Sequence, residues 1–149
     1  MQRWVDYKHA FEDLSSLPAE QRLARLLQEY GSGGLSLSID ELRRLFIYTW
    51  ADGSNPPDQD REVLRLLRWI APVRDVDTYL SGTHIVYSGA AGNENAIRWT
   101  LDEQAARQEW GDDLVRGEVE SNEVLAHLMA GGKNHVLVDP DEVGDVRPV

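Results

Sequence analysis

The chain has 149 residues, of which 42% are hydrophobic and 28% are charged, a composition typical of folded globular proteins. Its formal net charge of −11 disfavours binding to nucleic acid, because an acidic surface repels the phosphate backbone. No apolar run approaches the length of a membrane span, and the lack of cysteine excludes disulfides and thiolate metal ligands. These features predict a cytoplasmic protein with no membrane partner.

The acidic side chains are concentrated in the last third of the sequence. Residues 1–100 carry 14 acidic and 11 basic side chains, whereas residues 101–149 carry 12 acidic and 4 basic ones. One interpretation is a solvated acidic face, and the other is a docking face for a basic partner. A further hypothesis is an acidic decoy that mimics nucleic acid and competes with DNA for a basic protein.

Three stretches in the first seventy residues have the apolar spacing of amphipathic helices. The first ends at Gly31, the second begins with a capping box over residues 38–41, and the third is closed by Pro72. We expect Trp50 and Trp69 to be core or helix-contact residues, because large aromatics at helical spacing are usually packing residues. The apolar faces are formed by Leu23, Leu26, Leu27, Tyr30, Leu42, Leu45, Phe46, Thr49, Val63, Leu64, Leu67 and Ile70.

From Thr83 onward the pattern changes to short apolar or β-branched runs separated by glycine, asparagine and aspartate. One helix interrupts these runs. Thr100 and Glu103 have the spacing of a capping box, and the helix is predicted to end near Trp110. The predicted strands cover residues 85–87, 96–99, 114–119, 124–128 and 135–138.

The predicted fold class is therefore α+β, with N-terminal helices followed by a small mixed β-sheet on which one helix packs. We assign residues 1–80 to the helical region and residues 81–149 to the β-rich half, and one compact unit is expected. No internal repeat or low-complexity tract is visible.

Four stretches of the second half have the order and spacing of motifs in the ADP-ribosyltransferase fold. Over roughly residues 83–143 the chain resembles the class whose motif residues are arginine, serine or threonine, and glutamate. In that class an aromatic-arginine-glycine strand precedes a tryptophan-threonine strand, and the last strand has glutamate just before valine-leucine-valine. The matching stretches here are Tyr87-Ser88-Gly89, Trp99-Thr100-Leu101-Asp102, Val124-Leu125-Ala126 and His135-Val136-Leu137-Val138-Asp139-Pro140.

The resemblance implies a cleft formed by Ser88, Thr100 and His135. In the family the arginine binds the phosphates of NAD, and the glutamate stabilises the cationic transition state. Here Ser88 stands at the arginine position and His135 at the glutamate position, while Thr100 is kept. Lys133 stands where some members have a second acid. Losing one transition-state contact of this kind typically costs on the order of 3–4 kcal/mol, so losing both predicts that no turnover remains.

The first functional hypothesis is a pseudoenzyme with no cofactor. A degenerate ADP-ribosyltransferase-like protein would act as a protein-binding or regulatory module, engaged through its acidic half or its N-terminal helices. Small proteins with this pattern resemble phage or prophage products, and that resemblance makes a host protein the expected partner.

The alternative hypothesis is an active NAD-dependent mono-ADP-ribosyltransferase with relocated catalytic residues. Arg98, Trp99 and Thr100 would bind the cofactor, with Arg98 as the substitute cation if its side chain faces the cleft. Glu94 or Glu142 would supply the carboxylate. A separate and less favoured hypothesis is a metal site, whose ligands would be His127, His135 and Asp139.

Overall fold

The computed structural model describes residues 4–32, 36–52, 55, 57–76, 80–90 and 96–149. The chain divides into two compact units, Met1–Ile70 and Ala71–Val149. Helices make up the first unit and strands dominate the second, which confirms the predicted mixture of α and β structure. Val73 and Arg74, which were assigned to the helical region from the sequence, pair with a strand of the second unit.

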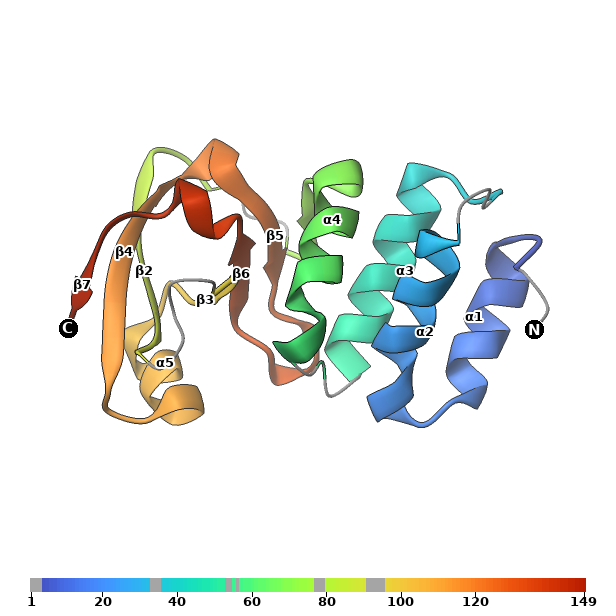
Figure 1. Cartoon of the computed structure of the whole chain (residues 1–149), viewed down its shortest axis with the longest axis horizontal. Coiled ribbons are helices and arrows are strands. Elements are labelled where there is room, and N and C mark those ends of the chain that lie inside the picture. The colour runs from blue at the N-terminus through green and yellow to red at the C-terminus, as the bar shows by residue number, and fades with distance from the viewer. Residues whose placement is uncertain (1–3, 33–35, 53–54, 56, 77–79, 91–95) are drawn as a thin grey trace. The chain divides into compact units, whose positions relative to one another are not determined.

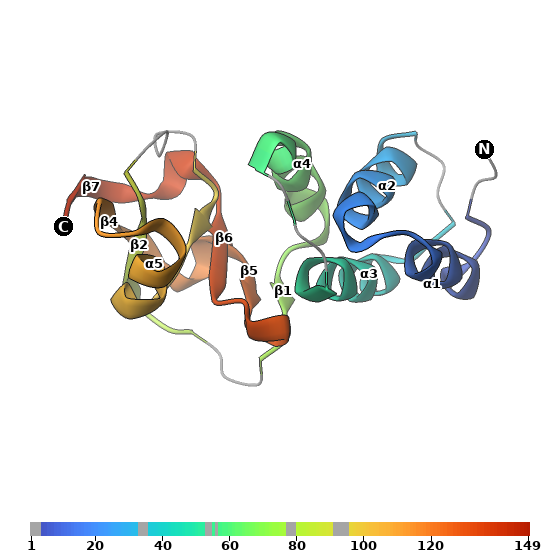
Figure 2. The same cartoon turned by 90° about the horizontal axis from the view of Figure 1, so that it is seen from below.

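The described residues of the first unit form four α-helices, with the short 3₁₀ turn η1 (Pro57–Gln59) before the last. Successive helices run in opposite directions (Figure 1), and α1 and α3 lie on one side with α2 and α4 on the other (Figure 2). The predicted capping box is present, since Ser38 Oγ accepts from Glu41 N at 3.1 Å and Glu41 Oε1 accepts from Ser38 N at 2.9 Å. The helices are α1 (Tyr7–Ser16), α2 (Ala19–Gly31), α3 (Ile39–Asp52) and α4 (Asp60–Ile70).

The two tryptophans that the sequence assigns to helix packing differ in the structure. Trp50 is fully buried and stacks on Phe46 with ring centroids 5.5 Å apart. Trp69 is 61% exposed, which corrects the expectation that it belongs to the core. The buried positions of α4 are spaced three or four residues apart, and Trp69 falls outside the arc that they define. Those positions are Val63, Leu66, Leu67 and Ile70.

A largely buried ion-pair cluster joins α1 to α2. Arg25 contacts Asp13 Oδ2 through Nε at 2.7 Å and Glu29 Oε1 through a terminal guanidinium nitrogen at 2.9 Å. The indole of Trp4 donates to the same Asp13 oxygen at 2.7 Å and also lies under the guanidinium. Burial alone would raise the pKa of Asp13, but the hydrogen bonds from Trp4 and Arg25 outweigh it and lower that pKa. The carboxylate is therefore held in its charged form.

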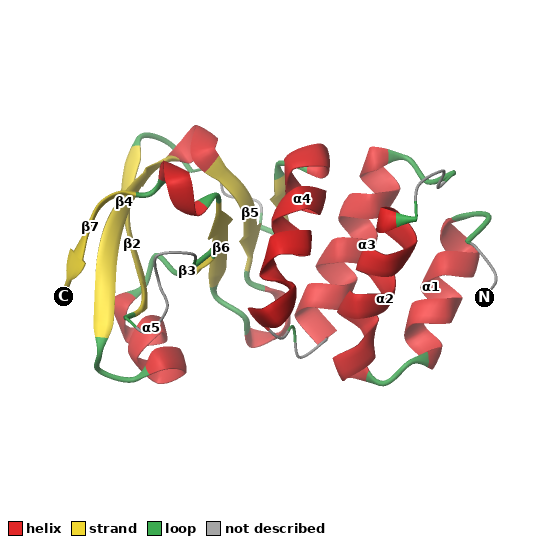
Figure 3. Ribbon diagram, in the orientation of Figure 1, coloured by secondary structure: helices red, strands yellow, loops and turns green. Residues whose placement is uncertain are grey.

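The second unit contains two sheets and one α-helix, α5 (Glu103–Trp110), rather than the single sheet expected from the sequence. The first sheet has the order β1-β5-β6-β3 and is mixed, because β1 and β5 are parallel; the second is antiparallel, with the order β2-β4-β7. Figure 3 shows the strands in yellow. Their bounds are β1 (Val73–Arg74), β2 (Thr83–Gly89), β3 (Arg98–Trp99), β4 (Leu114–Glu120), β5 (Val124–Leu128), β6 (His135–Val138) and β7 (Gly144–Pro148).

Side chains from both sheets form the core of the second unit. Trp99 of β3 is 1% exposed and packs among valines of β2, β4 and β6, while α5 contacts β2 and β4. Alternation along the strands directs every second side chain toward this shared core. The valines are Val86, Val115, Val119, Val136 and Val138.

Helix α5 begins later than its predicted capping box. Thr100 still forms a β-bridge with Tyr87, so its backbone is held in the sheet and cannot cap the helix. Asp102 is the N-cap, and its carboxylate accepts from Gln104 N at 2.9 Å. Thr100 Oγ1 accepts from Asp102 N at 3.2 Å and thereby supports the turn that leads into the helix.

Candidate functional site

The three strands that carry the motif positions are neighbours. Tyr87 and Thr100 exchange two backbone hydrogen bonds, of 2.8 and 2.9 Å, between the end of β2 and the end of β3. Trp99 pairs with Val136, which places β3 antiparallel to β6. Continuing this register sets Thr100 opposite His135. The segments of Ser88, Thr100 and His135 therefore lie at one end of these strands.

Ser88 occupies a structural position in this arrangement. It is 4% exposed, and its hydroxyl donates to the carbonyl oxygen of Arg98 at 2.8 Å. This bond ties β2 to β3, which pair only through the bridge at Thr100. The following Gly89 leaves room for the indole of Trp110, because a Cβ there would lie 3.0 Å from its Cγ. Ser88 therefore holds β2 against β3, and Gly89 allows Trp110 of α5 to pack against β2.

The residues expected to bind a cofactor are mostly built into the core. Trp99 is 1% exposed, and its indole donates to the carbonyl of Ala96 at 3.2 Å. Thr100 is equally buried and uses its hydroxyl to accept from Asp102 N. Arg98 is half-buried, with its backbone paired to Leu137 and its carbonyl bonded to Ser88.

His135 contacts a carboxylate that sequence reasoning missed. Its Nε2 lies 2.8 and 3.1 Å from the two carboxylate oxygens of Glu109, near the end of α5. The imidazole is buried, whereas the Glu109 side chain is 43% exposed, and the ring of Trp110 lies 6.3 Å from the imidazole. Nothing in the local pattern signals this pair, because it forms only when α5 packs against the end of β6. The contact places a carboxylate next to the buried imidazole of His135.

Of the two acids proposed as relocated catalytic groups, only Glu142 lies among the described residues. Glu94 lies outside the described residues. Glu142 is exposed in the 3₁₀ turn η5 (Pro140–Glu142), where a hydrogen bond to Glu123 raises its pKa, with the charges of Glu123, Asp139 and Asp141 adding to the effect.

The hypothesis of a metal site at His127, His135 and Asp139 is wrong. His127 pairs with Val136, whereas His135 pairs with Leu128, so the two imidazoles leave opposite faces of the sheet. Across residues 4–32, 36–52, 55, 57–76, 80–90 and 96–149, no group of three or more potential ligands could hold a metal ion.

Comparison with known proteins adds no relative. No protein-family model, curated protein or solved structure matches this chain. Functional interpretation therefore depends on the residues themselves and on the geometry of the second unit. In the described part of the chain, no helix has the length and apolar character needed to cross a membrane.

The second buried histidine, His127 on β5, has a lowered pKa. Burial is the main cause, and the nearby charges of Arg74 and His84 add to it, while Asp75 acts in the opposite direction. Its Nδ1 is buried with no hydrogen-bond partner among the described residues. His127 is therefore an uncharged polar group with unused hydrogen-bonding capacity.

Because of this shift, we expect the second unit to lose stability as the pH falls below the ordinary histidine pKa of 6.5. The unfolded chain takes up a proton there, whereas folded His127 does not until lower pH, so the stability present at neutral pH declines across that interval. Urea unfolding between pH 7 and pH 5 should show a weaker decline in His127→Gln than in the parent. Equal declines in both proteins would contradict the assignment.

Proposed function

We propose that this chain is a degenerate ADP-ribosyltransferase-like protein that binds another protein and performs no chemistry on NAD. The observation that carries the proposal is the burial of Ser88, Thr100 and His135, at 4%, 1% and 5% exposure. Each of their side chains forms a hydrogen bond inside the second unit. Binding a dinucleotide through them would break these bonds, and each buried polar group left unpaired costs about 1–3 kcal/mol.

Charge supports the same proposal. A pyrophosphate is held by cations with fixed hydrogen-bond donors, and a serine whose only hydroxyl proton is given to a backbone carbonyl supplies neither. Glu109, an acid that contacts the motif residues, is bonded to His135. The polar groups at this end of the strands thus satisfy one another, which suits a supporting structure rather than a reaction centre.

The partner that fits best is a basic protein. Residues 71–149 carry 15 acidic and 6 basic side chains, and exposed acids follow β6 at Asp141 and Glu142. Glu123, Asp139 and Asp141 lie near Glu142 and add to the negative charge at this point. Such a surface steers a positively charged partner toward it. The resemblance to phage products makes a host protein in the cytoplasm the expected source of that partner.

Reversing charge on this surface tests the proposal. We expect Asp141→Lys combined with Glu142→Lys to abolish recovery of a specific basic protein by the tagged chain, in pull-downs from the lysate of its source. The control is Glu12→Lys with Glu20→Lys, which makes the same change in charge at exposed positions of the first unit. Recovery should survive in the control and decline with rising salt. Unchanged recovery in the first variant, or no specific partner for the parent, would contradict the proposal.

One observation favours a second candidate function, an active NAD-dependent mono-ADP-ribosyltransferase. Glu109 presents a half-exposed carboxylate beside His135 and could serve as the relocated acid, with Arg98 holding phosphate. This candidate predicts transfer of label from NAD to protein, lost in Glu109→Gln. Glu94→Gln and Glu142→Gln test the other two candidate acids in the same assay. No transfer by the parent would exclude this candidate.

A further inference from the structure

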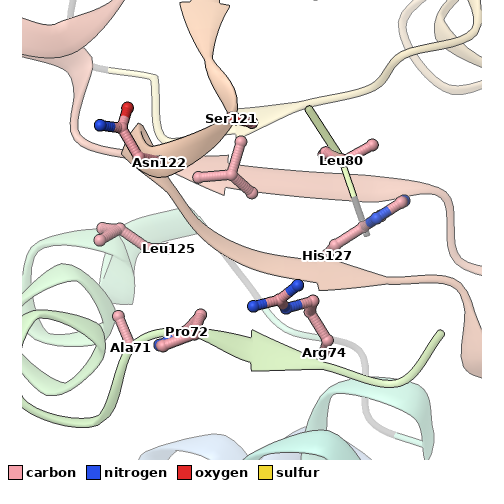
Figure 4. A pocket seen from close by; sticks show the side chains of 9 residues that line it. Ala71, Pro72, Arg74, Leu80, Ser121, Asn122, Leu125 and His127 are labelled. Atoms are coloured by element: carbon pink, nitrogen blue, oxygen red, sulfur yellow. The ribbon is translucent and has the colours of Figure 1, made fainter. Parts of the chain in front are cut away.

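The second unit contains a pocket that Ser88, Thr100 and His135 do not line. Its volume is about 470 Å³, within the usual range for small-molecule sites. Its walls come from β1, β5, the segment leading to β2 and the turn between β4 and β5 (Figure 4). The lining is mostly apolar, with one charged side chain, that of Arg74. The lining residues are Ala71, Pro72, Arg74, Leu80, Ser121, Asn122, Val124, Leu125 and His127.

The strand register places the polar groups of this pocket side by side. Arg74 of β1 is the direct partner of His127 on β5, and in a parallel pair such partners share one face of the sheet. Leu125 also lines the pocket, at the irregularity of the β5–β6 register between Val124 and Ala126. In Figure 4 the guanidinium of Arg74 extends from β1 toward the space between the two strands, with His127 and Leu80 on one side of it and Leu125 and Asn122 on the other.

His127 is a buried polar residue in the wall of this pocket. It is 8% exposed, so more than nine tenths of the residue is buried, and its Nδ1 has no hydrogen-bond partner among the described residues. A buried polar atom without a partner is costly and uncommon in folded proteins. The carboxylate of the neighbouring Asp75 accepts from the backbone nitrogens of Met129 and Ala130 instead. Because Nδ1 is covered by protein atoms, other atoms of His127 line the pocket.

We propose that this pocket binds a small organic anion. Arg74 provides a permanent charge and a planar donor fork that matches the oxygens of a carboxylate or phosphate group. Ser121 and Asn122 add hydrogen-bonding side chains at the rim, and Leu80 and Leu125 contact the apolar body of the ligand. His127 lines the site beside Arg74. The site is independent of the proposed protein partner, because it uses none of the acidic residues assigned to that surface.

Titration of the full chain, followed by NMR, tests this site with four probes. Benzoate and phenyl phosphate each join an apolar ring to an anion, benzamide is the neutral counterpart of benzoate, and inorganic phosphate is an anion without an apolar body. We expect benzoate, phenyl phosphate or both to shift the signals of the His127 ring and the Leu125 amide in a saturable way. The tighter of the two identifies the anion class. Benzamide and inorganic phosphate should each bind at least about tenfold more weakly than the better probe. Benzamide lacks the negative charge, and inorganic phosphate lacks the apolar ring.

Substitutions of Arg74 test whether the probes bind in this pocket. Arg74→Gln should weaken binding about tenfold or more, since it removes a charged hydrogen-bond donor, while Arg74→Lys keeps the charge and should lose less. Arg147→Gln removes an exposed arginine of the same unit and should leave affinity unchanged. The spectrum of each free variant shows whether it is folded. Absence of saturable shifts with both organic anions, equal binding of either control probe, or unchanged affinity in folded Arg74 variants would overturn the proposal.

Discussion

Replacing Trp99 by alanine is expected to lower the free energy of unfolding of the second unit by about 3–5 kcal/mol, the usual cost of truncating a buried aromatic residue. Trp99 is 1% exposed at the centre of the core shared by the two sheets, and its indole also bonds to the Ala96 carbonyl. Removing it leaves a cavity lined by valines of β2, β4 and β6. A loss of this size is comparable to the whole stability of many small units, so the variant is expected to be largely unfolded at ambient temperature.

The matched control is Trp69→Ala, which truncates the same residue type at a position that is 61% exposed. We expect its effect to stay within about 0.5 kcal/mol, as for most surface substitutions. Because the chain has two compact units, urea unfolding should be followed through amide signals assigned to each unit. Equal losses of unfolding free energy in the two variants would contradict the placement of Trp99 in the core. If Trp99 instead contacted a cofactor, Trp99→Ala would reduce the affinity for NAD and leave the stability nearly unchanged.

Replacing Arg25 by alanine is expected to destabilise the first unit by about 3–5 kcal/mol, because it leaves a buried charge uncompensated. Arg25 bridges Asp13 on α1 and Glu29 on α2, and the side chains of Arg25 and Glu29 are 10% and 7% exposed. Loss of the guanidinium also removes one hydrogen bond that keeps the pKa of Asp13 low. Both effects act on the packing of α1 against α2.

Arg44→Ala provides the comparison for Arg25→Ala. Arg44 pairs with Asp40 on the surface of α3, and the two side chains are 62% and 64% exposed. An exposed pair of this kind contributes about 0.3–0.5 kcal/mol, so the variant should unfold at nearly the same urea concentration as the parent. If Arg25→Ala and Arg44→Ala have similar midpoints, the cluster at Asp13 does not stabilise the unit.

The sequence predicts α2, α3 and α4 well because their signals are local, whereas α1 (Tyr7–Ser16) was not predicted as a separate helix. The apolar period, the capping box before α3 and the stop at Gly31 all act within one or two turns, and each is present in the structure. Errors arise where distant contacts decide the outcome. Strand β1 has two residues and exists through pairing with β5, and β7 is exposed along its whole length and contains glycine and proline, so neither has a recognisable pattern. The second sheet was missed for the same reason.

The candidate site was predictable only in part. The order of motif stretches placed Tyr87, Thr100 and Val136 on neighbouring strands, and the register agrees. The roles of the side chains at this site could not be predicted from the sequence, because their burial and hydrogen bonding depend on packing between elements. The contact of His135 with Glu109 requires α5 to be docked. The pocket at Arg74 requires the pairing of β1 with β5, which no spacing in the chain reveals.

Calorimetric titration of the full chain with NAD tests the central claim most directly, namely that the buried residues at the motif positions support the fold and bind no cofactor. We predict no heat beyond dilution up to about 1 mM NAD, the upper end of the usual range of KM values for enzymes. The parent protein should also show no transfer of label from NAD. Saturable binding of NAD that is weakened in Glu109→Gln or Arg98→Gln would contradict the claim, because it would show a working cofactor site at the end of β3 and β6.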